Sequence, residues 1–553
     1  MYMKRTKFDR SHVYKTTFDS GKLIPVFVDE VLPGDTFSVD TSAIIRMTTP
    51  KFPVMDDAFI DFYYFYCLDR ILWDDFKYFM GEVEETPWMP KKEYRVPQIK
   101  IYGTSSLPKP YEKTILDYMG VPTKIKKSFS INALPIRAYV KIWNEFFRDE
   151  NVGNEATIKT TSEDVEFASG GAGGGAETGT TIENLLQNAY KGGFCLPVNK
   201  FHDYFTSCLP YPQRGPAVTI PMAGNAPVRL GDANNQYVNF TSPIEMVLGL
   251  TSASNRPGSL TYSPETGGTK EKKRMQFTGT EATTGQLGGG AWMYADLEDV
   301  TAATVNDLRK AVAVQQYYEA LARGGSRYRE QVQALWNVVI SDKTAQVPEY
   351  LGGGRYRVNI NQIVQTSGQQ TNTDTPIGET GAMSVTPINE SSFTKSFEEH
   401  GFIIGVCCVR HNRSYQQGLE RFWSRTDRLD YYVPQFANLG EQPVKKKEIM
   451  LTGDATDDET FGYQEAWADY RMKPNRVSGL MRSNATGTLD FWHYADNYET
   501  VPTLSQDWME EGKTEIARTL IVQDEPQFFG AIRVANKTTR RMPLYSVPGL
   551  YKL

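Results

Sequence analysis

Glycine-rich runs are the first feature of this sequence that could bind a ligand, because glycine loops cradle phosphate groups. The run at 170–175 reads GGAGGG, but no lysine follows it until Lys191. A phosphate loop needs a preceding strand, a following helix N-terminus and a Lys-Ser/Thr pair. Residues 169–181 therefore predict a Gly-rich surface loop. The triplet at 352–354 lacks the same context and predicts a turn.

Metal-binding or acid–base chemistry would require histidines, cysteines or carboxylates at suitable spacings. The five histidines show no HxH, HExxH or Cys/His spacing, so we expect structural or surface roles for each of them: His12, His202, His400, His411 and His493. The five cysteines show no CxxC pair, which predicts neither a disulfide framework nor a zinc site. The acidic residues Asp454, Asp457, Asp458 and Glu459 could hold calcium, but they lack the EF-hand pattern and favour a solvated turn. The sequence thus predicts no catalytic residues, no metal and no cofactor.

Basic residues are concentrated at the two chain ends. Residues 1–20 have a net charge of +3, and residues 526–553 contain five basic and no acidic residues, a net charge of +5. The basic residues of 526–553 are interleaved with four aromatic residues: Phe528, Phe529, Tyr545 and Tyr551. A protein that binds single-stranded nucleic acid requires this combination, because basic residues neutralise phosphates and aromatic rings stack on bases. A terminal arm packed on a neighbouring subunit explains the same pattern, and both interpretations stay open. The candidate nucleic-acid-binding residues are Lys4, Arg5, Lys7, Arg10, Arg540 and Arg541.

The overall composition limits the class of protein. The chain has 553 residues with 60 basic and 66 acidic side chains, a net charge of −6, which argues against a generic polyanion binder. Aromatic residues make up 12%, beside 45 glycines and 30 prolines, a mixture typical of strands joined by long loops. No secretory signal opens the chain, and its most apolar stretches are too short to span a membrane. We expect synthesis in a reducing cytoplasm and no membrane insertion.

The expected elements are strands at both ends of the chain and helices in the middle. Strands are predicted over 22–32, 36–47, 58–68, 401–410 and 530–534, and helices over 70–80, 134–146, 182–191, 304–323 and 327–336. No β-α-β alternation occurs, so an antiparallel, mainly β core with inserted helices is favoured over a parallel sheet. Residues 225–300 are rich in Gly, Ser and Thr with little periodicity, and predict an insertion that leaves the core.

With these elements placed, ordered blocks of the sequence resemble one family. The blocks are RSH at 10–12, TTFDSGKLIP at 16–25, EVLPGDTF at 30–37, MDDAF at 55–59, FMGE at 79–82, LPYPQRG at 209–215, RGGSRY at 323–328, HGFI at 400–403, WSR at 423–425 and YQEAWADYR at 463–471. Together they resemble the gokushovirus (Microviridae) major capsid protein. Residues 169–181 and most of 225–300 do not match that pattern.

The resemblance implies a fold and a function. The fold is an eight-stranded antiparallel jelly roll of viral capsid type with long loop insertions, one domain over 1–553 with a basic N-terminal arm at 1–20 and a basic C-terminal arm at 526–553. The function is self-assembly, with 60 copies in a T=1 icosahedral virion shell around a circular single-stranded DNA genome of a small bacteriophage, assembled in the host cytoplasm. The family also implies a small basic DNA-packaging protein, and a threefold protrusion formed by residues 225–300 that contacts a host receptor. An enzyme on a jelly-roll scaffold and a soluble DNA-binding module are the alternatives.

Overall fold

The computed structural model describes residues 4–82, 93–102, 111–123, 125–167, 182–218, 228–231, 259–261, 276–278, 292–295, 305–364 and 380–545. The chain forms two compact units, one made of residues 1–214 and 320–553 and the other of residues 215–319. Each unit is described by itself. The second unit contains the segment 225–300 that the sequence predicted as an insertion.

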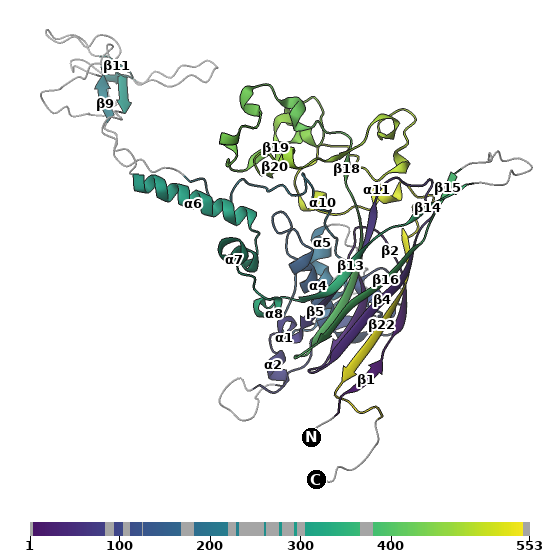
Figure 1. Cartoon of the computed structure of the whole chain (residues 1–553). Coiled ribbons are helices and arrows are strands. Elements are labelled where there is room, and N and C mark those ends of the chain that lie inside the picture. The colour runs from purple at the N-terminus through teal and green to yellow at the C-terminus, as the bar shows by residue number, and fades with distance from the viewer. Residues whose placement is uncertain are drawn as a thin grey trace, which may run out of the picture. The chain divides into compact units, whose positions relative to one another are not determined.

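The first large sheet of the main unit has five strands. β22 (Phe528–Arg540) lies in its middle, between β4 (Thr36–Met47) on one side and β1 (Thr6–Asp9) with β2 (His12–Phe18) on the other, and β16 (Thr386–Ser396) pairs with β4. All of these pairs are antiparallel. In Figure 1 the strands β22, β4 and β16 run side by side. Buried and exposed side chains alternate along β4 and β22, so one face of this sheet packs on the core and the other is open.

The second large sheet has four antiparallel strands in the order β13 (Glu349–Arg357), β5 (Ala58–Leu68), β17 (Gly401–His411) and β3 (Ile24–Val31). Strands β5 and β17 are almost continuously apolar, and nearly every side chain along them is buried. A strand with this pattern is covered on both faces. The predicted mainly β chain with antiparallel sheets and inserted helices is therefore confirmed.

The two sheets pack on each other through a mixed aromatic and polar interface. Tyr64 of β5 lies within 2.6 Å of the Thr41 hydroxyl of β4, oxygen to oxygen, and its ring centroid is 5.6 Å from that of Phe393 on β16. All three side chains are buried. Because the hydroxyls satisfy each other, the polar atoms add no uncompensated cost to an otherwise apolar core.

Helices cover the other face of the four-stranded sheet. The longest is α4 (Leu134–Phe146), whose Phe146 ring lies 4.7 Å from Phe65 and whose Tyr139 hydroxyl donates to the Leu23 carbonyl at 2.7 Å. Short helices and a three-stranded sheet surround it: α1 (Asp69–Leu72), α2 (Phe76–Phe79), α3 (Ile115–Tyr118), α5 (Ile182–Asn188), β6 (Gln98–Ile101), β7 (Phe129–Asn132) and β8 (Val165–Glu166).

The remaining segments of the main unit are short. A second apolar cluster around Tyr204, Phe205, Val444, Phe461 and Trp508 holds the C-terminal connections together. These connections contain β18 (Ser414–Tyr415), β19 (Gln442–Lys445), β20 (Thr460–Gln464), α9 (Ala468–Arg471), β21 (Asn475–Arg476), α10 (Gln506–Met509) and α11 (Thr514–Ala517). Before them come α7 (Tyr328–Trp336), α8 (Asp342–Ala345), β14 (Ile360–Val364) and β15 (Thr380–Ser384).

The unit at 215–319 contains two small antiparallel sheets. β9 (Val228–Gly231) pairs with β12 (Trp292–Ala295), and β10 (Ser259–Thr261) pairs with β11 (Gln276–Thr278). Helix α6 (Val305–Arg323) begins near the end of this unit. The rest of 225–300 and the loop at 169–181 lie outside the described residues.

Several predicted boundaries are wrong for physical reasons. The helix expected over 70–80 is two short helices, because Trp73 between them has extended backbone angles. The turn expected at 352–354 lies inside β13, where a Cβ on Gly353 would stand 2.0 Å from the Phe62 carbonyl oxygen of the neighbouring strand. The strand expected over 530–534 extends from Phe528 to Arg540, and residues 6–18 form strands as well. Helix α7 begins at Tyr328, one residue after the predicted start, with Arg327 at its N-cap. No helix in the described part of the chain is long and apolar enough to cross a membrane.

Candidate nucleic-acid interface

The two basic chain ends come together in one place. β1 pairs antiparallel with the last residues of β22, so that Thr6 lies opposite Arg540 and Asp9 opposite Lys537. In Figure 1 this is where the purple first strand lies beside the yellow last strand. The six residues predicted to contact nucleic acid therefore form one cluster, which we call the basic corner: Lys4, Arg5, Lys7, Arg10, Arg540 and Arg541.

Two members of the basic corner are paired with carboxylates. Arg10 binds Asp29 at 2.7 Å, and Arg540 binds Asp35 at 2.8 Å. The side chains of both aspartates are almost fully buried. Arg540 also lies over the Phe37 ring and donates to the Glu30 carbonyl. These two arginines fix the β3–β4 turn, and their charge is already compensated.

The other four members of the basic corner differ in whether they already form hydrogen bonds. Arg5 donates to the Gly34 carbonyl at 2.7 Å and to the Thr36 hydroxyl. Lys4, Lys7 and Arg541 are exposed and form no ion pair with any residue that the structure describes. Phosphate groups could therefore reach four of the six cations without breaking an ion pair between described residues, and three of these four without displacing a described hydrogen bond of Arg5.

Asp9 is a further acidic residue of this region, besides Asp29 and Asp35. Hydrogen bonds from the Ser11 hydroxyl and backbone N–H, together with the charges of Lys537 and Arg533, hold the pKa of Asp9 below its usual range. Asp9 consequently stays ionised at neutral pH. It reduces the positive charge of the corner without cancelling it.

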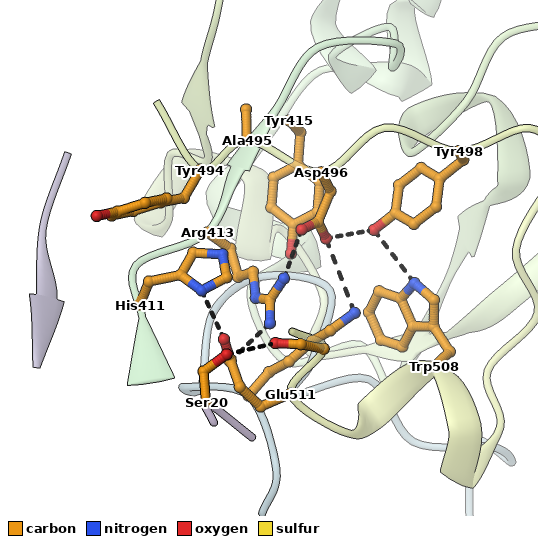
Figure 2. Close-up of polar contacts among 12 residues, drawn as sticks. Ser20, His411, Arg413, Tyr415, Tyr494, Ala495, Asp496, Tyr498, Trp508 and Glu511 are labelled. Atoms are coloured by element: carbon orange, nitrogen blue, oxygen red, sulfur yellow. Dashed lines mark hydrogen bonds and ion pairs between the residues drawn. The ribbon is translucent and has the colours of Figure 1, made fainter. Parts of the chain in front are cut away.

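A dense cluster of charged side chains is buried in the main unit (Figure 2). The guanidinium of Arg413 lies between Asp496, at 2.5 Å, and Glu511, at 2.6 Å. His411 Nδ1 lies 2.5 Å from Glu511, and Lys200 Nζ lies 3.7 Å from Asp496. All five residues are less than one tenth exposed.

The electrostatics of this cluster are those of a closed structural network. Burial alone would raise the pKa of Asp496, but the Arg413 guanidinium and the Lys200 ammonium hold it well below the usual range. Tyr498 adds a hydrogen bond to Asp496 at 2.6 Å and accepts one from the Trp508 indole at 3.2 Å. Each charge thus faces an opposite charge, and the cluster ties the end of β17 to the C-terminal connections.

The acidic run at 454–459 contains a short 3-10 helix, Ala455–Asp458. Asp457 accepts hydrogen bonds from the Thr452 and Gly453 backbone N–H groups, and Asp458 binds Lys445 and Lys447 at 2.9 Å each. The carboxylates of Asp457 and Asp458 therefore already have partners. Within the described ranges no three His, Cys, Asp or Glu side chains are grouped so as to hold a metal ion.

Comparison with known proteins shows to which protein family the chain belongs. The family model described as "Capsid protein (F protein)" matches residues 1–550 of this chain. The chain belongs to this capsid protein family. Three curated relatives are each named capsid protein VP1. The one from Chlamydia phage 1 is 39% identical, the one from Bdellovibrio phage phiMH2K 36% and the one from Spiroplasma virus 4 34%, and each alignment covers all of this chain and 96% of the relative.

The family match indicates the role of the buried Arg413 network. This chain is a structural capsid protein of Microviridae phages, not an enzyme, and the resemblance found in the sequence is confirmed. As part of a capsid protein, the Arg413 network stabilises the subunit and needs no access to substrate. The histidine prediction holds at His411, which is buried and structural.

Sequence reasoning missed this network because its members are far apart. Arg413 is 83 residues from Asp496 and 98 residues from Glu511. Only the HxR spacing of His411 and Arg413 places two members together, and it matches no known motif. The junction of the two chain ends was missed for the same reason, since strand pairing over such a separation leaves no local pattern.

Proposed function

We propose that this capsid protein is the subunit of a closed T=1 virion shell of 60 copies that encloses a circular single-stranded DNA genome. The observation that carries the proposal is the family match over nearly the whole chain. Assembly would take place in the host cytoplasm, and the finished protein would reside in the virion.

The order of the long strands supports a jelly roll of capsid type. With β1 and β2 counted as one, eight long strands follow along the chain. Numbered 1 to 8, they lie in the orders 1-8-3-6 and 2-7-4-5 in the two sheets. Strands that are consecutive in the chain mostly alternate between the sheets, and the first and last are neighbours. Two interleaved Greek keys produce this order.

Exposed apolar side chains support contacts between copies. Trp336, Val339, Trp423, Leu429 and Tyr431 are each more than half exposed in the single chain. Contiguous exposed apolar patches mark interfaces, and interface cores are enriched in aromatic side chains. A closed shell would bury such surfaces around every subunit.

The charge distribution supports a DNA-filled interior with help from another protein. The basic corner offers Lys4, Lys7 and Arg541 to phosphate, with the other three predicted residues at the same place. The net charge of −6 means that one chain cannot neutralise much of a genome. A small basic packaging protein and counterions would supply the remaining positive charge.

The insertion at 225–300 would form the threefold protrusion and contact a host receptor. What supports this is that residues 215–319 form a compact unit of their own. The two large sheets are complete without it.

Isolated particles test the enclosure of DNA and the place of the basic corner. Particles purified by sedimentation should contain nuclease-protected single-stranded DNA. A bulky amine-reactive reagent should label Lys4 and Lys7 in dissociated subunits but not in intact particles. Labelling of both lysines in intact particles would contradict an interior or subunit-seam position.

A further inference from the structure

The open face of the five-stranded sheet carries a groove that the function described so far does not use. Its floor is formed by the exposed side chains of β2, β22 and β4: Thr17, Phe529 and Arg46 lie in one row across the three strands, and Lys15, Ala531 and Ile44 in the next. The segment before and within α3, with Lys113, Asp117 and Tyr118, forms its wall. The cavity has a volume of about 750 Å³, within the range of ligand clefts.

We propose that this groove, defined by Lys15, Ile44, Arg46, Lys113 and Phe529, binds a segment of single-stranded DNA. A base stacks on the Phe529 ring, and the three cations hold the adjoining phosphates. The inference rests on the proposed enclosure of single-stranded DNA and names a contact site for it.

The charge of the groove matches a polyanion. Lys15, Arg46 and Lys113 form no ion pair with any residue in the described ranges, unlike Arg10 and Arg540 of the basic corner. The acid of the groove is Asp117, whose carboxylate accepts the Lys113 backbone N–H at 2.9 Å. Three cations against one carboxylate leave a net positive charge beside the apolar side chains of Ile44, Phe529 and Ala531. A peptide partner would instead require acidic residues at matching positions.

Two features show that the groove is built and not merely left open. Phe529 is 40% exposed, although its neighbours Phe528 and Gly530 are buried, so an aromatic face is presented on the solvent side of a central strand. Lys113 has a backbone φ of 62°, a left-handed conformation that non-glycine residues rarely adopt. The bond to Asp117 maintains this conformation at the groove wall.

The positive charge continues beyond the groove. Arg533 and Lys537 lie on the same open face of β22, on the way from Phe529 to the basic corner. From residue 529 to residue 537 the strand rises about 27 Å. A single strand bound in the groove can therefore extend along β22 to Lys7, which lies opposite Thr539.

Binding of a fluorescein-labelled ten-residue oligodeoxythymidylate to the unassembled full-length chain tests the groove. Because stacking contributes about 1–3 kcal/mol per base, Phe529→Ala should weaken binding about tenfold. Phe422→Ala is the matched control, since Phe422 is equally exposed elsewhere on the main unit, and it should leave binding unchanged. Lys15→Ala and Arg46→Ala should each reduce the salt dependence of log K by about 0.7, whereas Lys159→Ala should not.

Ultraviolet cross-linking in DNA-filled particles gives a second measurement that needs no variant. It should attach nucleotides to the peptide that contains Phe529. The inference is overturned if the oligonucleotide fails to bind, if Phe529→Ala binds like the parent chain, or if cross-links avoid that peptide. DNA-filled particles with any of these results would leave the proposed shell intact, whereas failure to form particles would contradict the shell and not the groove.

Discussion

Charged residues in this capsid protein act in two different ways, depending on burial. Arg413 is buried between two carboxylates, whereas Lys4 and Lys7 project from the sheet surface without a described ion-pair partner. The spacing of the five histidines matches no metal or catalytic motif, and one of them, His411, is buried against Glu511. The sequence could not indicate the Arg413 network, because nothing in the local pattern near residue 413 specifies Asp496 or Glu511.

Removing the buried guanidinium should strongly destabilise the subunit. Arg413→Met removes the guanidinium that both Asp496 and Glu511 bind, leaving only Lys200 near Asp496 and His411 near Glu511, and the free energy of unfolding should fall by about 3–5 kcal/mol. Urea unfolding of the purified chain measures this change. Arg471→Met is the control, because the Arg471–Glu465 pair is about half exposed and should cost less than about 1 kcal/mol. Equal losses in the two variants would contradict the structural role of the network.

Asp69 should make stability depend on pH. Burial, together with the nearby charge of Glu30, raises the pKa of this carboxyl from 3.8 to about 7. The folded chain therefore binds a proton that the unfolded chain has lost between about pH 4 and pH 7, so this residue lowers stability as pH rises through that window. Asp69→Asn should reduce that slope and stabilise the protein at pH 8 by on the order of 2 kcal/mol.

Denaturant unfolding at pH 5 and pH 8 measures the effect of Asp69→Asn. The exposed Asp454→Asn provides the control and should show the slope of the parent chain. If the stability of Asp69→Asn fell with pH as steeply as that of the parent chain, the buried Asp69 carboxyl would not be the source of the pH dependence.

Secondary-structure elements were predictable where the pattern is local. The strict alternation along β4 and the unbroken apolar runs of β5 and β17 gave strands close to the observed bounds. The glycines at 352–354 predict a turn, whereas in the fold they permit close contact between strands. The basic residues of the chain ends predict arms from local composition alone, and nothing local indicates that β22 pairs with strands more than 480 residues away.

The position of β22 predicts how the chain tolerates C-terminal truncation. A chain that ends at Arg541 keeps every described strand and should fold with an unchanged melting temperature. A chain that ends at Gln527 loses the strand that pairs with β1, β2 and β4, together with the buried Phe528, Ile532 and Val534, and should be insoluble. Soluble yield and circular dichroism compare the two. Equal folding of both chains would contradict the central place of β22.

At the scale of the whole molecule, the ordered sequence blocks indicate the family but not the arrangement of charge. The two chain ends have net charges of +3 and +5. Because the whole chain has a net charge of −6, the residues between the ends have a net charge of −14. Folding brings both positive ends to one corner of one sheet, which composition alone cannot reveal. The jelly roll was an expectation from the resemblance, because long-range strand order is not encoded in local periodicity.

Deleting residues 225–300 should separate assembly from infection. These residues lie within the compact unit at 215–319, and the two large sheets contain none of them. We expect near-normal particle yield on a sucrose gradient and at least a hundredfold loss of infectivity. Loss of particles while the subunit still folds would contradict this division of roles.

The central claim is self-assembly into a closed shell, and electron microscopy of the purified full-length chain tests it most directly. We predict uniform icosahedral particles, and 60 copies of the 62.5 kDa chain give a shell mass of about 3.8 MDa, which mass photometry can verify on the same sample. Folded chain that stays monomeric, or that forms only irregular aggregates when expressed with the other virion proteins, would contradict the account.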